Sequence, residues 1–316
     1  MLLIPLKTKA RDFLKSIIGL NSLATHTGGS NMGTKDLTEK ILEAHNDVFA
    51  DIFNVIIFEG KQRIQPKTLQ DSLVHSQYRA ADTDIHEMER DISKLWIEKN
   101  VALSICGIEN QTKIDRYMPF RIIGYDGTAY RSQLLSSEKH PIPVVTLVLY
   151  FGTDKKWDEP INLKGVLDIP DGLDHYVNDY KIHVVNVAWL TDEQLNMFRS
   201  DFGIVARFFC EKRQNKDYIP KDQTVIRHVD EVLKLLSVMT GDKRYEEILL
   251  CDGKDVNTMC DVAERLENKG RLEGRLDEIF SSVEAHDYSM ERGAEKAQMN
   301  MADFKHAMKE AGYHLP

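Results

Sequence analysis

Residues 91–109 read DISKLWIEKNVALSICGIE, and this stretch predicts a pair of adjacent β-strands. Residues 91–97 alternate between apolar and polar side chains, as a half-buried strand does. Residues 101–109 are mostly apolar, which is typical of a more deeply buried strand. Because the polar residues 98–100 lie between the two runs, the sequence predicts a β-hairpin.

The predicted hairpin brings acidic side chains together near its open end. A three-residue turn centred on Lys99 would put Asp91 opposite Gly107, so Glu109 would be the diagonal neighbour of Asp91 on the same face. Gln111 follows Glu109 on that face because strand side chains alternate. Two close carboxylates are costly unless a cation neutralises them, and Mg²⁺ prefers oxygen ligands. We therefore expect a metal site held by Asp91 and Glu109.

Other elements are expected on both sides of the hairpin. An apolar repeat every three or four residues predicts a helix over 36–58, and Pro119 begins a second predicted helix that runs to about residue 135. Strands are predicted at 144–151 and 181–190. Residues 61–88 carry no pattern that assigns them to an element. Alternating strands and helices indicate the α/β class.

The chain after residue 190 has a helical pattern. Thr191 and Gln194 have the spacing of a capping box, and Ser289 and Asn300 are predicted helix caps near the end of the chain. The repeat GRLEGRLD at 270–277 can pair its charges along a helix, and its glycines would let another helix approach closely. Helices are predicted at 192–200, 203–214, 224–239 and 255–268.

Composition and patterning divide the 316 residues into three regions and exclude several classes of protein. We expect an N-terminal extension at 1–33, an α/β domain at 34–220 and a helical region at 221–316. No apolar run reaches the length of a membrane span. The net charge of −9 argues against a protein that coats nucleic acid with a basic surface. The 4 cysteines form no Cys-x-x-Cys pair and the 11 histidines are scattered, so we expect no zinc site or disulfide framework and a cytoplasmic location.

Several ordered segments resemble one known family. They are HNDVFADIFN (45–54), ERDISKLW (89–96), GIENQT (107–112), MPFRIIGYD (118–126), PVVTLVLYFG (143–152), VNDYKI to WLTDEQ (177–194) and HVDEVLKLLSVMTGD (228–242). Together they resemble the recombination-promoting nuclease (Rpn) family, whose transposase-like members belong to the PD-(D/E)XK nuclease superfamily. Asp91 with Glu109-Asn110-Gln111 matches the superfamily signature, with Gln in the lysine position. The resemblance extends roughly from Leu37 to Leu276.

The resemblance implies a fold, an activity and roles for individual residues. The fold would be a restriction-endonuclease-like core of mixed sheet between helices, and the activity would be metal-dependent DNA cleavage in mobile-element-like recombination. Asp91 and Glu109 would hold Mg²⁺, for which Mn²⁺ could substitute. Gln111 would orient the attacking water, and Asp47 matches a position where the superfamily often carries a further acidic group.

The sequence departs from the superfamily at Gln111, which has a dipole where lysine would carry a charge. Lys113 shares strand parity with Gln111 and is a candidate for the missing cation. Arg121 and Tyr125 are four residues apart and so lie on one helix face. Arg121 is a candidate for phosphate binding and Tyr125 for contact with a sugar or base.

Ordinary structural roles compete with these assignments. Asp91 and Glu109 also fit solvent-facing strand positions, Asp47 a structural helix position, and Arg121 and Tyr125 a surface ion pair and a packing aromatic. Our first hypothesis is an Mg²⁺-dependent DNA endonuclease that self-associates through its C-terminal helices. The alternative is a catalytically weak or inactive module that binds DNA or a protein. A third hypothesis, a transposase that also joins strands, lacks a recognisable joining domain.

Overall fold

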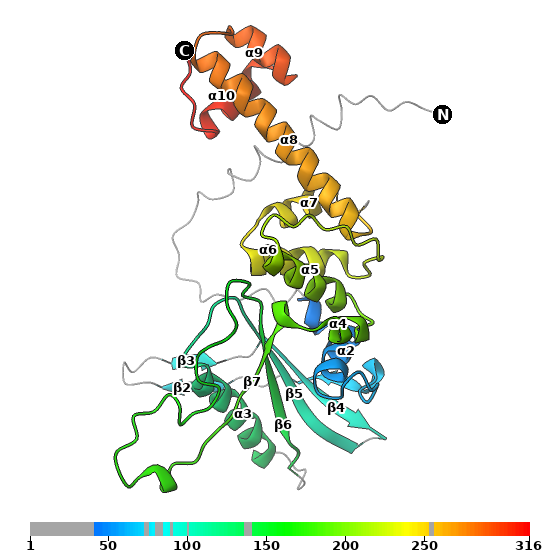
Figure 1. The fold of residues 1–316 in the computed structure, drawn as a ribbon, viewed down its shortest axis with the longest axis vertical. Coiled ribbons are helices and arrows are strands. Elements are labelled where there is room, and N and C mark those ends of the chain that lie inside the picture. Colours follow the sequence, from blue (N-terminus) through cyan, green and yellow to red (C-terminus); the bar gives the residue numbers. More distant parts are fainter. Residues whose placement is uncertain are drawn as a thin grey trace. The chain divides into compact units, whose positions relative to one another are not determined.

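The structure, a computed structural model, describes residues 41–72, 76–79, 85–88, 91–99, 101–135, 141–252 and 256–316 (Figure 1). The N-terminal extension expected at 1–33 lies outside the described residues. Two compact units are present. The sheet-bearing unit extends to Ile219 and includes Ile226–Asp242, and the helical unit comprises Pro220–Val225 and Lys243–Pro316. Residues 226–242 therefore belong with the sheet, whereas the sequence pattern placed them in the helical region.

The sheet-bearing unit is built on a mixed five-stranded sheet with the strand order β1-β4-β5-β6-β7. β4 pairs antiparallel with both β1 and β5, while β5, β6 and β7 run parallel to one another. This arrangement confirms the α/β class. The strand bounds are β1 Leu69–Asp71, β4 Ile92–Glu98, β5 Val101–Gln111, β6 Val144–Tyr150 and β7 His183–Asn186.

The two faces of this sheet are packed by different helices, α2 (Asn46–Ile56) and α3 (Met118–Leu135) (Figure 1). Ile105 of β5 packs with Ala129 of α3 in one apolar cluster. Lys94 of β4 lies 5.8 Å from the ring centre of Phe49 on α2. Lys94 pairs with Cys106, so these two side chains point to the face that α2 covers. Ile105 is next to Cys106 in the strand and therefore points to the opposite face. Odd-numbered residues of this part of β5 therefore face α3, and even-numbered residues face α2.

The turn of the β4–β5 hairpin is shorter than the sequence pattern suggested. Glu98 pairs with Val101, which leaves a two-residue turn, and Lys99 adopts a left-handed conformation with φ 48°. The register also shifts between Trp96 and Ile97, where the ladder is irregular. Such an irregularity adds a residue to one strand and changes the pairing beyond it.

The register of the hairpin corrects the expected placement of its acidic residues. Ile92 pairs with Ile108. Continuing the ladder by one position puts Asp91 directly opposite Glu109, and not opposite Gly107 as the three-residue turn implied. Direct partners in an antiparallel pair lie closer than diagonal neighbours. The two acids are therefore nearer in the ladder than the sequence pattern predicted.

The helix predicted over 36–58 is interrupted in the described part of the chain, and residues 36–40 lie outside it. Leu42–Ala44 forms a short 3-10 helix, η1, and His45 is extended with ψ 130° before α2 begins at Asn46. Leu42 is fully buried although it precedes the extended residue His45. The apolar repeat therefore reflects buried positions before and after His45, and not one continuous helix.

The remaining elements of this unit include several that the sequence predicted. The helix beginning near Pro119 and the strand at 144–151 are confirmed as α3 and β6. The capping box of Thr191 and Gln194 is formed at the start of α4, Asp192–Met197. The strand predicted at 181–190 ends at Asn186, after which the chain forms a 3-10 helix. Helices α5 and α6 span Phe202–Gln214 and Val229–Thr240.

Residues 61–88, which showed no pattern, contribute short elements. These are a 3-10 helix at Pro66–Thr68, strand β1, and a separate antiparallel pair formed by β2 (Ser76–Arg79) and β3 (Ile85–Met88). Strands of three or four residues carry too few side chains for an alternating pattern to be recognised.

The helical unit contains α7 (Arg244–Asp252), α8 (Met259–Glu284), α9 (Met290–Ala297) and α10 (Met301–Glu310). α8 continues well beyond the predicted end at residue 268. Ser289 and Asn300 cap α9 and α10 as predicted, each accepting a backbone N–H bond. The end of α8 packs with α9 and α10 in a small apolar core of Ile279, Phe280, Val283, Ala294, Phe304 and Met308. Within the described residues, no helix is long and apolar enough to cross a membrane.

Candidate active site at the open end of the hairpin

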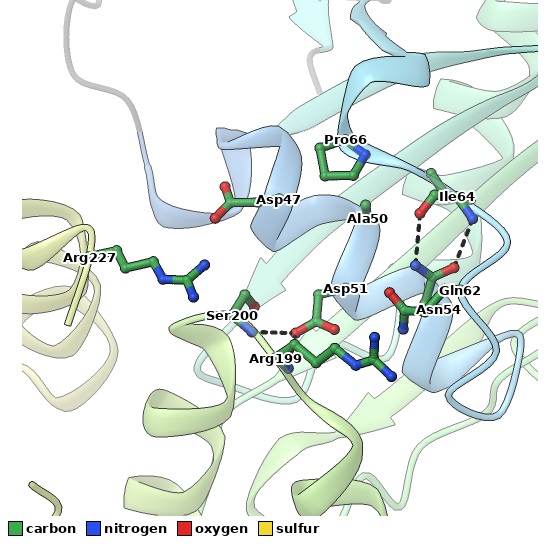
Figure 2. A pocket seen from close by; sticks show the side chains of 10 residues that line it. All are labelled: Asp47, Ala50, Asp51, Asn54, Gln62, Ile64, Pro66, Arg199, Ser200 and Arg227. Carbon is green, nitrogen blue, oxygen red and sulfur yellow. Dashed lines mark hydrogen bonds between the residues drawn. The ribbon is translucent and has the colours of Figure 1, made fainter. Parts of the chain in front are cut away.

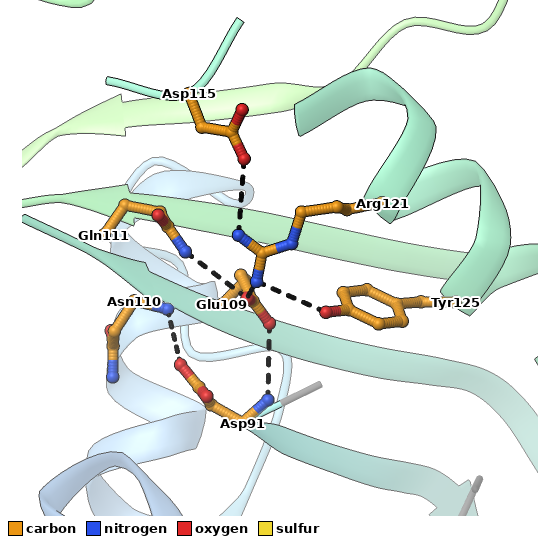
Figure 3. Close-up of polar contacts among 7 residues, drawn as sticks. All are labelled: Asp91, Glu109, Asn110, Gln111, Asp115, Arg121 and Tyr125. Carbon is orange, nitrogen blue, oxygen red and sulfur yellow. Dashed lines mark hydrogen bonds and ion pairs between the residues drawn. The ribbon is translucent and has the colours of Figure 1, made fainter. Parts of the chain in front are cut away.

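Asp91 and Glu109 are held together by hydrogen bonds at the start of β4 and the end of β5 (Figure 3). The carboxylate of Asp91 accepts a bond of 2.8 Å from the backbone N–H of Asn110. The backbone N–H of Asp91 lies 3.4 Å from Glu109 Oε2. Asp91 is exposed, whereas the side chain of Glu109 is only 2% exposed. The site thus combines one buried and one accessible carboxylate.

Glu109 faces α3, and a cation from that helix meets it. Arg121 Nη2 forms an ion pair with Glu109 Oε1, and Gln111 Nε2 lies 3.3 Å from the same oxygen. Gln111 therefore shares the face of Glu109, as strand parity predicted. A buried carboxylate that lacked such a partner would be strongly destabilised.

Arg121 and Tyr125 lie on one face of α3, as their spacing predicted (Figure 3). Arg121 Nη2 donates to the Tyr125 hydroxyl at 3.3 Å, and Arg121 Nη1 lies 3.5 Å from Asp115 Oδ2. Tyr125 is buried at 6% exposure. Burial and the negative charge of Glu109 raise the pKa of Tyr125, despite its bond with Arg121, so its hydroxyl stays protonated. In this structure Tyr125 positions Arg121 and is largely removed from solvent.

Glu43 is a further acidic residue at the site that the sequence analysis did not single out. It lies in η1 and its side chain is fully buried. Burial, together with the negative charge of Asp91, raises the pKa of Glu43 to about 7. Glu43 and Asp91 are therefore close enough to interact electrostatically. No sequence signal distinguished Glu43, because acidic residues are ordinary in an amphipathic helical pattern.

Three buried oxygens near Asp91 have no hydrogen-bond partner among the described residues. They are both carboxylate oxygens of Glu43 and the amide oxygen of Asn110. The backbone N–H of Glu43 and the side chain of Asn110 lie close enough to lower the pKa of Glu43, yet neither forms a hydrogen bond of normal geometry with its carboxyl. Buried acceptors without donors are costly, so this arrangement calls for a proton or a cation. An all-oxygen set of donors fits a hard divalent cation.

Two of the predicted site residues lie elsewhere. Asp47 Oδ2 is 3.2 Å from His228 Nε2, and this bond, together with the charge of His228, outweighs burial and lowers the pKa of Asp47. Lys113 is exposed and follows the end of β5 at Gln111. The structure thus brings Asp91, Glu109 and Gln111 together with Arg121 and Tyr125, and does not place Asp47 among them.

Comparison with known proteins identifies the family. The family described as "Putative transposase, YhgA-like" matches residues 62–237, which is more than half of the chain. The chain therefore belongs to this family, the transposase-like Rpn family that the sequence segments resemble. No curated protein and no solved structure shows a significant match.

Proposed function

We propose that this protein is an Mg²⁺-dependent DNA endonuclease that cleaves phosphodiester bonds in recombination or mobile-element activity. The observation that carries the proposal is the buried carboxyl of Glu43 beside Asp91, whose two oxygens have no hydrogen-bond partner among the described residues. Family membership supports the same class of activity.

The arrangement of the sheet supports a PD-(D/E)XK-type core. A helix, an antiparallel hairpin, a second helix and a parallel strand follow one another as α2, β4, β5, α3 and β6. This is the mixed sheet between helices that the family resemblance implies. The signature acids lie at the end of the hairpin, where the backbone N–H of Asp91 donates to the Glu109 carboxylate and the Asp91 carboxylate accepts from the backbone N–H of Asn110.

Each residue at the site can be given a role in cleavage. Asp91 and Glu109 would hold the metal, and Glu43 would lie beside Asp91 as a neighbouring acid. When bound, Mg²⁺ would acidify a water and stabilise negative charge on the phosphate. Gln111 is anchored beside Glu109 and would orient the attacking water. Arg121, which is 37% exposed, can offer its outer edge to a phosphate oxygen.

The remaining partners are proposed on simpler grounds. The net charge of −9 requires that DNA contact be local to the site, because like charges repel over the rest of the surface. For self-association we propose the middle of α8, where an added Cβ at Gly270 or Gly274 would meet nothing within 4 Å. A cytoplasmic location follows from the low cysteine count and is a proposal as well.

A plasmid-nicking assay tests the function. Purified protein is incubated with supercoiled DNA in Mg²⁺, Mn²⁺, Ca²⁺ or EDTA, and we expect nicking with Mg²⁺ and Mn²⁺ only. Asp91→Ala and Glu109→Ala should each abolish it while circular dichroism stays unchanged. A folded variant of either residue that cleaves at the wild-type rate would remove that residue from the metal site.

One observation favours the alternative of a binding module without strong activity. Arg121 already supplies a positive charge to Glu109, and a cation in the site would have to share that carboxylate. Absence of nicking with every metal, together with retained DNA binding, would support the module. The Gln111 variants described below separate the two functions further.

A further inference from the structure

A second cluster of ionisable side chains lies where α2 and α6 begin. His45 is the N-cap residue of α2, and His228 is the N-cap residue of α6. Asp47 and Glu231 belong to the first turns of the same two helices. We call these four residues the His–carboxylate cluster. All of them lie in the sheet-bearing unit.

The cluster is cross-paired between the helices. His45 Nε2 is 3.0 Å from Glu231 Oε1, and His228 Nε2 is 3.2 Å from Asp47 Oδ2. The two imidazole rings stack with their centres 3.9 Å apart and their planes 27° from parallel. Each histidine of one helix thus contacts a carboxylate of the other, and the two rings meet between them.

The spacing of the donor atoms is close to that of a metal site. One ligand atom each from His45, Asp47 and His228 can be chosen so that all lie within 4.8 Å of one another. Ligands of a zinc-like ion lie about 2.0–2.2 Å from it, so two of them are at most roughly 4.4 Å apart. Small side-chain rotations would bring the three atoms onto one ion.

Charge and donor type select the class of ion. With neutral imidazoles the cluster carries two negative charges, from Asp47 and Glu231, which a divalent cation balances. Imidazole nitrogen suits transition metals, whereas Mg²⁺ and Ca²⁺ prefer oxygen. We propose that the His–carboxylate cluster binds a divalent transition-metal ion of the zinc class. His45, Asp47 and His228 supply its ligands, and Glu231 holds the ring of His45 in place.

The cluster also has a route to solvent. Asp47 lines a pocket of about 130 Å³ on the sheet-bearing unit, and Figure 2 shows its carboxylate on the same side as Arg227. The wall of the pocket is fixed by Asp51 Oδ2, which accepts the backbone N–H groups of Arg199 and Ser200 at 2.7 Å each. An ion can enter there and keep a water or an anion as its remaining ligand.

A bound ion would join the beginning of α2 to the beginning of α6. This inference does not rest on nuclease activity. It departs from the expectation from sequence that zinc binding is absent, because residues 45 and 228 share no motif and become neighbours only through the fold.

The experiment is a titration of metal-free, tag-free protein with Zn²⁺ by calorimetry, with Co²⁺ absorption as a second probe of ligand geometry. We expect one ion per chain and a higher melting temperature on binding. His228→Ala and His45→Ala should each abolish tight binding, and Glu231→Gln should weaken it by about 10- to 100-fold, as loss of an outer-shell partner does.

Two controls keep the result specific. His175→Ala removes an exposed histidine in a 3-10 helix at Asp174–Tyr176 and should leave Zn²⁺ binding unchanged. The double variant Asp91→Ala/Glu109→Ala should lose nicking yet keep Zn²⁺ binding, which distinguishes this site from the hairpin. Wild-type protein that binds no Zn²⁺, or folded His45 and His228 variants that bind it as wild type does, would overturn the proposal.

Discussion

At the scale of single residues, the carboxyl of Glu43 makes the stability of the folded protein depend on pH. Its pKa is raised from 4.5 to about 7 in the folded protein. The contribution of Glu43 to stability is therefore greatest below about pH 4.5 and is lost as the pH rises through 7, because the folded state then has to bury a charge. A shift of this size corresponds to about 3 kcal/mol as an upper limit.

We predict that Glu43→Gln raises the stability of metal-free protein above pH 7 by up to about 3 kcal/mol and changes little near pH 4.5. The amide is neutral at both values and keeps the shape of the side chain. Urea unfolding at the two pH values measures the difference. Glu59→Gln, an exposed carboxyl after α2, is the matched control. An equal effect of Glu43→Gln at both pH values would contradict the buried charge.

Gln111 is the residue proposed to orient the attacking water. Its amide lies 3.3 Å from Glu109 and supplies a dipole, whereas a lysine would supply a full charge. We predict that Gln111→Lys retains or raises nicking, and that Gln111→Ala loses about one to three orders of magnitude, comparable to removing one oriented donor. Single-turnover nicking rates measure both.

Lys113→Ala is the companion variant for this prediction. Lys113 is exposed beyond the end of β5, so its loss should matter less. If Gln111→Ala cleaves at the wild-type rate and Lys113→Ala is inactive, the catalytic role belongs to Lys113 and not to Gln111. Nicking by Gln111→Lys alone, with an inactive wild type, would identify the natural protein as a binding module.

At the scale of elements, strong local patterns predicted type and position. The apolar run at 144–151 and the Thr191–Gln194 capping box appear as β6 and the start of α4. The hairpin was predicted but not its register, because a two-residue turn and an irregularity near Trp96 each shift the pairing by one residue. Backbone irregularities of this kind leave no trace in hydrophobic alternation.

The site was predictable only where its residues are close in sequence. Asp91, Glu109 and Gln111 lie on one hairpin, so strand parity was enough to group them. Glu43 is brought near enough to Asp91 to interact with it only by the fold, and no local rule foresees that proximity. Arg121 was found by its helical spacing, but its pairing with Glu109 depends on how α3 packs on β5.

Helix α8 contains two glycines in its interior, where glycine costs about 0.5–1 kcal/mol relative to alanine. Nothing lies within 4 Å of a Cβ added at Gly270 or Gly274. We predict that Gly270→Ala/Gly274→Ala raises the melting temperature of the isolated chain and, if the glycines meet a second copy, weakens self-association. Melting at low concentration and light scattering at high concentration measure the two effects. Lower stability at low concentration would contradict an open helix surface.

At the scale of the whole molecule, the unit boundaries define where the chain can be cut. A truncation at residue 268 would divide α8, whose Lys269 pairs with Glu247 of α7. We predict that truncation after Asp242 leaves the sheet-bearing unit folded and reduces self-association. Circular dichroism and light scattering measure this. An unchanged number of chains per particle would contradict a role of the helical unit in assembly.

The pairing of His45 with Glu231 has a consequence for biosynthesis, because these residues are 186 positions apart. Helix α6 completes the unit that η1 and α2 begin, so the nascent chain cannot close this contact until most of it has left the ribosome. Until then η1, which carries the buried Leu42, lacks its contacts with α6. Contacts between such remote residues form slowly and prolong the exposure of apolar surface. Chaperone dependence during synthesis is therefore expected to fall sharply once α6 has emerged.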